Sequence, residues 1–166
     1  MKFFNQMGDN RNMTFNIDIP AVKYGQKIDP KYTCRGQDIN PQVKWVDPPQ
    51  SAKSFVLVME DPDAPRGTFV HWVLYNIPQG ISEVPEGLQK EEHLPNGWVQ
   101  GKNDFGRTGY GGPCPPGRST HRYFVYLYAV NRMPDLQPGL LKAQVMKEIE
   151  RYIVKQVSFM FRFGQE

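Results

Sequence analysis

The hydrophobic pattern along this chain predicts β-strands separated by many turns. Phe15, Ile17 and Ile19 alternate with polar residues in segment 13–19, which is the pattern of a strand with one buried face. Residues 55–59 form a continuous apolar run, which predicts a strand buried on both faces. The segments 43–46, 71–77 and 121–130 also indicate strands. Fifteen prolines and fifteen glycines interrupt the pattern, so little helix is expected.

One amphipathic helix is predicted near the C-terminal end, where the spacing of apolar residues changes to three and four. Pro138 and Gly139 precede it, and its apolar face consists of Leu140, Leu141, Val145, Ile149, Tyr152 and Ile153. Residues 159–163 are expected to return as a short strand. Together these elements predict a mainly β fold, a sandwich of two sheets with a peripheral C-terminal helix.

The length of 166 residues predicts a single domain. We assign residues 13–166 to that domain and residues 1–12 to a disordered or frayed N-terminal extension, with Met1 and Met13 as alternative start residues. The polar N-terminus lacks the apolar core of a secretory signal, and no apolar stretch approaches the roughly 20 residues of a membrane span. A cytoplasmic location without a transmembrane segment is therefore expected.

Charge and cysteine content narrow the class of protein further. The formal net charge is +3 and no run of Lys or Arg forms a basic stripe, so a nucleic-acid partner is not expected. Cys34 and Cys114 are too few for a disulfide scaffold and lack the spacing of a zinc site. We expect them to be reduced in a cytosolic protein. The sequence does not give their distance, so a single disulfide between them stays an open alternative.

Two loops rich in proline and glycine each lead into a strand that begins with a histidine. The first contains Asp61 and Asp63 and precedes His71, whereas the second, residues 109–116, precedes His121. Two of the three histidines of the chain therefore occupy matching contexts. This repeated combination favours a polar site at the ends of the two strands.

Alternation along the strands indicates where these side chains point. His71 is expected to share a face with Val73, Tyr75 and Ile77. His121 is expected to share a face with Tyr123 and with the alternate residues Val125, Leu127 and Ala129. If the two strands are neighbours, both imidazoles and the Tyr123 hydroxyl converge at one end of a sheet, near the carboxylates of the first loop.

Such a cluster suits a small anion that also carries a cation. Protonated histidines and a tyrosine hydroxyl donate hydrogen bonds, and exposed backbone amides at Gly111 and Gly112 can add more. Asp61 beside the histidines would raise the pKa of the imidazoles and pair with an ammonium group of the ligand. Taken alone, an Asp-Pro-Asp sequence is also a common turn, and a histidine at a strand end is often structural.

The two loops resemble the hallmark motifs of the phosphatidylethanolamine-binding protein family, also called Raf-kinase-inhibitor-like. The first motif is Asp61-Pro62-Asp63-Ala64-Pro65 followed by Phe69-Val70-His71-Trp72. The second is Tyr110-Gly111-Gly112-Pro113-Cys114-Pro115-Pro116 followed by His121-Arg122-Tyr123. An upstream segment, residues 32–45, is similar to that of bacterial and archaeal members. The resemblance covers about residues 13–162.

This resemblance implies a β-sandwich with a small anion pocket at one end, which binds phosphate-bearing groups such as phosphoethanolamine. The pocket residues that it implies are Asp61, His71, Gly112, Cys114, Pro116, His121 and Tyr123, with Asp63 beside them. As partners it implies a small phosphorylated ligand or a phospholipid headgroup, and a kinase or a protease. It does not identify the natural ligand, because one fold of this kind serves several functions.

The favoured hypothesis is a non-enzymatic binding protein without a cofactor, which takes a phosphorylated small molecule or side chain and modulates a kinase or another signalling partner. An enzyme would use Cys114 and His121 as nucleophile and base, but prolines flank Cys114 and no oxyanion hole is readable. A protease inhibitor or interaction scaffold acting through surface loops is the alternative. A metal site from Asp61, Asp63, His71 and His121 is disfavoured, because their spacing matches no common ligand set.

Overall fold

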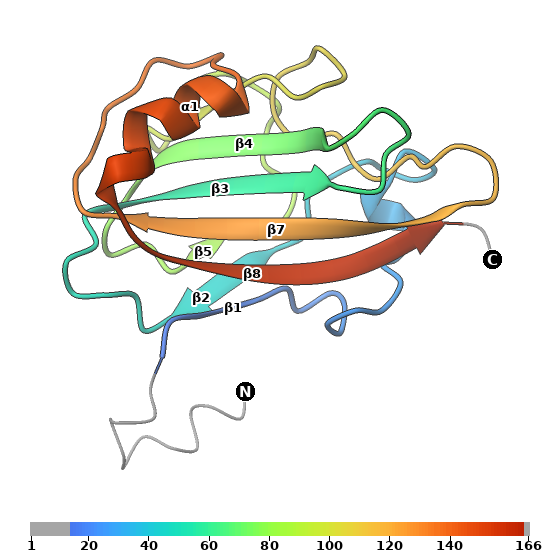
Figure 1. Cartoon of the computed structure of the whole chain (residues 1–166), viewed down its shortest axis with the longest axis horizontal. Coiled ribbons are helices and arrows are strands. Elements are labelled where there is room, and N and C mark those ends of the chain that lie inside the picture. The colour runs from blue at the N-terminus through green and yellow to red at the C-terminus, as the bar shows by residue number, and fades with distance from the viewer. Residues whose placement is uncertain (1–13, 165–166) are drawn as a thin grey trace.

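Two antiparallel sheets form the protein in the computed structural model, which describes residues 14–164 (Figure 1). The small sheet has the strand order β1 (Asn16–Asp18), β2 (Val43–Val46), β5 (Glu83–Val84). The large sheet has the order β6 (Val99–Gln100), β4 (Phe69–Pro78), β3 (Ser54–Asp61), β7 (Thr120–Val130), β8 (Ile153–Gly164). Helix α1 (Lys142–Ile149) and short 3-10 turns at Pro30–Tyr32 and Glu150–Tyr152 complete it. The mainly β fold with two sheets and one C-terminal helix is confirmed.

The large sheet is covered on both faces, which explains the continuous apolar run at residues 55–59. Phe55, Leu57 and Met59 pack in the core between the two sheets, against small-sheet residues such as Trp45. Val56 and Val58 point the other way, into a second core under α1. All five side chains of the run are fully buried. Each contributes on the order of 1.5–3 kcal/mol to folding, so β3 is the centre of the domain.

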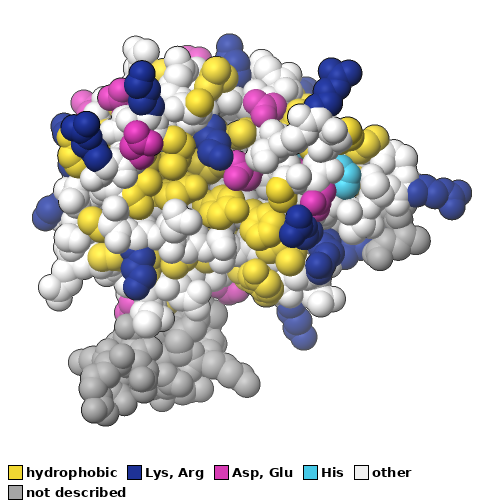
Figure 2. Space-filling view, in the orientation of Figure 1, with side chains coloured by type: hydrophobic (Ala, Val, Ile, Leu, Met, Phe, Trp, Pro, Cys, Tyr) yellow, Lys and Arg dark blue, Asp and Glu magenta, His cyan; other side chains and the backbone are white. Residues whose placement is uncertain are grey.

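Helix α1 covers only part of the outer face of the large sheet. The rings of Phe124 and Tyr126 stack on the uncovered part, with centroids 5.9 Å apart, and both residues are half-buried. Figure 2 shows hydrophobic side chains gathered on this face, with charged side chains around them. The helix therefore completes the second core but leaves part of the outer face of the large sheet uncovered.

The first and last strands differ in length from their predictions. The first spans only Asn16–Asp18, while residue 13 and the N-terminal extension assigned to residues 1–12 lie outside the described residues. The last spans 12 residues and pairs with β7 along its length, although a short strand at 159–163 was expected. Its first half, residues 153–158, is mostly exposed, so hydrophobic alternation is visible only at Phe159, Phe161 and Phe163.

A β-bulge at the start of β4 overturns one expectation about the strand faces. Met59 pairs with Trp72 and Glu60 pairs with Val70, so His71 is left without a partner in the register. This irregularity interrupts the alternation. Val73 and Tyr75 consequently pack in the core under α1 rather than on the face of His71.

The alternation predicted for β7 is confirmed. Tyr123, Val125, Leu127 and Ala129 all pack in the core between the sheets, on the side that His121 shares. The regular register of β7 against β3 explains this difference from β4.

Candidate functional site

The end of β3 and the starts of β4 and β7 lie at the same end of the large sheet, because β4 and β7 both pair antiparallel with β3. The strands β4 and β7 are not themselves adjacent, since β3 lies between them. Their loops surround a cavity of about 150 Å³. Six of the eight predicted residues line it: Asp61, His71, Cys114, Pro116, His121 and Tyr123. One water takes up about 30 Å³ in the liquid, so the cavity has room for one small group.

His121 forms hydrogen bonds through both ring nitrogens. Nδ1 lies 2.6 Å from Asp61 Oδ2, and Nε2 lies 3.1 Å from Ser119 Oγ. The Ser119 hydroxyl donates its own proton to Pro116 O, so it accepts from His121. The Asp61 carboxylate also accepts. All of these hydrogen bonds are therefore satisfied when His121 carries a proton on each nitrogen and forms a buried ion pair with Asp61.

Both carboxylate oxygens of Asp61 accept hydrogen bonds from protein groups. Oδ2 accepts from His121, and Oδ1 accepts from the backbone amide of Asp63 at 2.7 Å. The second bond is the local turn expected of an Asp-Pro-Asp sequence. The turn and the site are thus one structure, in which Asp61 holds His121 in place.

His71 is held by a backbone carbonyl rather than by a carboxylate. Its Nδ1 lies 2.6 Å from Gly111 O, and because a carbonyl only accepts, Nδ1 carries the proton and Nε2 is left for a ligand. Burial lowers the pKa of His71, although the Gly111 bond and the charge of Asp61 act in the opposite direction. Asp61 raises the pKa of this imidazole as expected, but desolvation outweighs its charge and the net shift is downward.

The Tyr123 hydroxyl is a buried polar group that lacks a hydrogen-bond partner among the described residues. The ring of Tyr123 lies edge-on to that of His71, with centroids 5.3 Å apart, and both side chains line the cavity. Burial raises the pKa of Tyr123, so the hydroxyl stays protonated and can donate. An unpaired buried hydroxyl costs about 1–3 kcal/mol, and an acceptor placed in the cavity would remove that cost.

The two glycines of the second loop do not offer free amides, contrary to expectation. The Gly111 amide donates to His71 O, and the Gly112 amide donates to Asp38 Oδ1 at 2.7 Å. Gly112 does not line the cavity. A Cβ at Gly112 would lie 2.4 Å from Tyr32 O and 2.5 Å from Asp38 Oδ1. The glycine is needed because the loop packs closely against the segment 32–38.

Asp63 does not line the cavity either. Its carboxylate accepts from the Arg122 guanidinium, with Oδ1 2.8 Å from Nη2, and from the Arg122 backbone amide. These bonds lower the pKa of Asp63 to about 2. Asp63 therefore fastens the first loop to β7, and this site prediction is corrected to a structural role outside the cavity.

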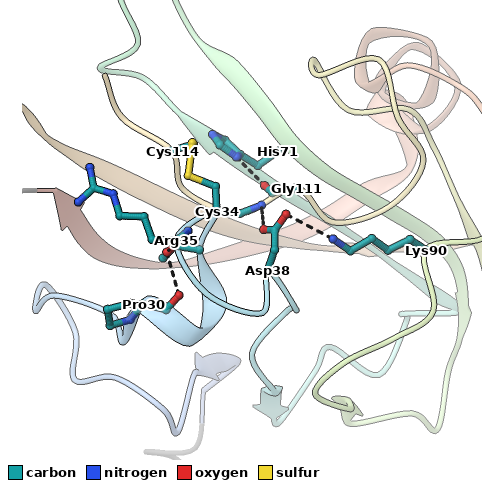
Figure 3. Close-up of a disulfide and its surroundings, with 10 residues drawn as sticks. Pro30, Cys34, Arg35, Asp38, His71, Lys90, Gly111 and Cys114 are labelled. Carbon is teal, nitrogen blue, oxygen red and sulfur yellow. Dashed lines mark hydrogen bonds and ion pairs between the residues drawn. A yellow bond between two sulfur atoms is a disulfide. The ribbon is translucent and has the colours of Figure 1, made fainter. Parts of the chain in front are cut away.

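A disulfide joins Cys34 to Cys114, with Cα atoms 5.5 Å apart (Figure 3). The expectation of two reduced cysteines is thereby corrected in favour of the alternative that was left open. Residues 80 apart in sequence meet because the segment 32–38 packs against the second loop, where Pro113 O accepts from the Cys34 amide. Cys114 is at once a cavity residue and half of this cross-link.

Five further residues line the cavity: Ala64, Pro65, Phe69, Phe105 and Pro115. Phe69 and Phe105 form an aromatic wall with His71, since their ring centroids lie 4.7 Å apart and that of Phe69 lies 4.9 Å from the imidazole. Phe105 was not predicted, because it sits in a polar loop just before the second motif and outside both motifs. Ser119 was missed as a partner of His121, although its position two residues before the histidine was a usable signal.

The described residues 14–164 contain no group of three or more His, Cys, Asp or Glu side chains that could hold a metal ion. Within that part of the chain, no helix is long and apolar enough to cross a membrane.

Sequence comparison places this chain in a known family. The sequence model described as phosphatidylethanolamine-binding protein matches residues 18–164. The chain is 47% identical over 138 residues to a UPF0098 protein of Aquifex aeolicus, covering 82% of this chain and 80% of the relative. It is 41% identical over 145 residues to a UPF0098 protein of Methanothermobacter thermautotrophicus, covering 87% and 95%. The chain belongs to the phosphatidylethanolamine-binding protein family.

Solved structures agree with this assignment. A crystal structure described as a phosphatidylethanolamine-binding protein homologue from Chlamydia trachomatis matches with a TM-score of 0.83 and 34% identity, over 92% of this chain and 99% of that chain. The YbcL protein of E. coli, described as a new member of the mammalian family, matches with a TM-score of 0.85 and 27% identity, over 93% and 100%. The predicted family and fold are confirmed.

Proposed function

We propose that this chain is a non-enzymatic binding protein whose cavity takes a small phosphate-bearing group, either phosphoethanolamine-like or on a phosphorylated side chain. The observation that carries the proposal is the unpartnered Tyr123 hydroxyl in a cavity that His71 and His121 also line. A phosphate oxygen accepts hydrogen bonds, and the Tyr123 hydroxyl is a cavity donor that the protein itself does not use.

The charges of the cavity also support an anion. Asp61 and Ser119 hold the ring of His121 in place, and as an imidazolium it would place a positive charge beside the cavity without needing the ligand. Burial lowers the pKa of the His71 imidazole and so favours its neutral form. An anion near Nε2 would favour protonation of His71, and binding would then take up a proton.

Binding without catalysis is the simpler function for this site. The enzyme hypothesis required Cys114 as a thiolate nucleophile beside His121, but its sulfur is bonded to Cys34. The nitrogen of His121 that would serve as a base donates to Ser119. We further propose that the bound group links the protein to a kinase or another signalling partner.

An NMR titration of the histidine side chains with phosphoethanolamine tests this function. We expect saturable shifts at His71 and His121, while the exposed His93 in the loop before β6 stays unchanged. Phosphotyrosine in a parallel titration distinguishes a phosphorylated side chain from a headgroup. No shift at either cavity histidine at tens of millimolar ligand would reject the proposal and favour a protease inhibitor or scaffold that acts through surface loops.

A further inference from the structure

The Cys34–Cys114 disulfide forms part of the cavity wall and is open to solvent. Both cysteines are exposed, and only Cys114 lines the cavity. In Figure 3 the disulfide lies beside His71 and its bond to Gly111. A small thiol in solution can therefore reach the Cys34 side of the disulfide without entering the cavity.

We propose that the Cys34–Cys114 disulfide is a thiol-exchange site that controls anion binding in the cavity. Reduction of the disulfide weakens anion binding, and a bound anion protects the disulfide from reduction. The inference rests on the proposed anion-binding function.

The disulfide is the cross-link that holds the cavity wall at this point. Up to Pro113 the second loop is held by hydrogen bonds: Gly111 bonds to His71, Gly112 bonds to Asp38, and Pro113 O accepts from Cys34. The next wall residues include Pro115 and Pro116, which have no amide hydrogen to donate. Pro116 O accepts from Ser119, three residues along the same loop, so this bond does not reach the segment 32–38. Breaking the disulfide removes the covalent link between that segment and the wall.

The chemistry of exchange favours a charged Cys114. A thiolate attacks Cys34 Sγ, a new sulfur–sulfur bond forms there, the Cys34–Cys114 bond breaks, and the electron pair leaves on Cys114 Sγ. A second thiolate attacks the external sulfur of the mixed disulfide and releases Cys34, giving two protein thiols and one small-molecule disulfide. Attack at the exposed Cys34 therefore leaves the negative charge on Cys114, which lines the cavity together with His71 and His121. Its negative charge then competes with an external anion.

Thermodynamic linkage requires that reduction change the anion affinity by the same factor by which a saturating anion changes the reduction equilibrium. If reduction weakens anion binding by a given factor, saturating anion shifts the reduction equilibrium toward the disulfide by the same factor. For this two-electron couple a tenfold factor corresponds to about 30 mV. The redox state of one exposed disulfide would thus set the occupancy of the cavity.

The test measures inorganic phosphate binding to the oxidised protein and to the protein reduced with dithiothreitol, which is neutral and does not compete for an anion site. We expect about tenfold or greater weakening on reduction, and a midpoint for dithiothreitol reduction that is about 30 mV more negative in saturating phosphate. Phosphate should also slow cleavage of the disulfide in the native oxidised protein. The Cys34→Ser/Cys114→Ser double variant is the control, and its affinity should not respond to dithiothreitol.

Each other outcome has a definite meaning. Equal phosphate affinity in both redox states would overturn the redox control and leave the proposed function intact. Absence of phosphate binding to the oxidised protein would overturn both. A reduced protein that loses its folded NMR spectrum would also overturn the inference, because the loss of binding would then be a loss of fold.

Discussion

The two loops that enclose the cavity are fastened to the rest of the protein by different forces. The first loop, residues 61–69, is attached to β7 by two ion pairs, Asp61–His121 and Asp63–Arg122. The second loop, residues 109–116, is attached to the segment 32–38 by a disulfide, by hydrogen bonds to backbone groups and by the bond of the Gly112 amide to the Asp38 carboxylate. The first attachment therefore responds to pH and the second to thiols. The same cavity is exposed to both kinds of control.

Loss of the buried ion pair should have the largest effect on stability. His121→Ala leaves the Asp61 carboxylate buried without its charged partner, because both side chains are almost fully buried. Removing one member of such a pair costs about 3–5 kcal/mol, so we expect the free energy of unfolding in urea to fall by that amount. His121→Gln retains a donor and should recover part of the loss. His93→Ala, at the exposed histidine, should change nothing; an equal loss there would remove the assigned role of the pair.

Removal of the disulfide should come next. Cys34 and Cys114 are 80 residues apart, so the cross-link restricts the unfolded chain over a long loop. Disulfides of this kind contribute about 2–4 kcal/mol, and we expect the Cys34→Ser/Cys114→Ser variant to lose that amount in urea unfolding. Between pH 4 and pH 2 the disulfide contribution should persist while the contribution of the Asp63–Arg122 ion pair is lost. A disulfide contribution that itself declines over that acid range would erase the distinction between the loops.

The sequence predicts the fold well because its signals are local and repeated. The apolar run at residues 55–59, the histidines at the heads of two strands and the helical spacing near Val145 each correspond to an observed element. The resemblance of the two loop motifs to those of a known family identified six residues that line one cavity in the structure. Residue type and order were sufficient for these features.

The details of the site depend on contacts that the sequence does not display. A bulge re-aims His71, and nothing in the alternation of β4 announces it. Phe105 reaches the cavity from a polar loop, and Gly112 is fixed by packing against Tyr32 rather than by ligand binding. The disulfide could not be decided from spacing, because the distance between Cys34 and Cys114 is set by the tertiary fold.

The pH dependence of anion binding should separate the two histidines. The pKa of His71 is lowered in the folded protein, so the unfolded chain binds more protons just below its ordinary value of about 6.5. Folding stability without ligand should therefore fall as the pH drops below 6.5. A bound anion favours the protonated form, so affinity should rise as the pH falls through the same range. Sulfate is the suitable probe, because its charge does not change there.

His71→Gln provides the matched variant for this measurement. It keeps a side chain that can donate to Gly111 O but removes the titrating group. Isothermal titration calorimetry at pH 5.5, 6.5 and 7.5 should show a rise in sulfate affinity toward low pH for the unaltered protein and a flat profile for the variant. An identical rise in both proteins would assign the dependence to another group and would leave His71 as a packing residue.

The exposed ion pair of the first loop should contribute least. Asp63 and Arg122 are both substantially open to solvent, and such pairs add little to stability. Because the pKa of Asp63 is lowered to about 2, its contribution is present above pH 4 and is lost as the pH falls from about 4 to 2. Asp63→Asn should leave the urea midpoint at pH 7 nearly unchanged and flatten its decline in that acid range. A large loss at pH 7, comparable to that of His121→Ala, would show that Asp63 rather than Asp61 holds the first loop, and the division of labour between the two carboxylates would have to be reversed.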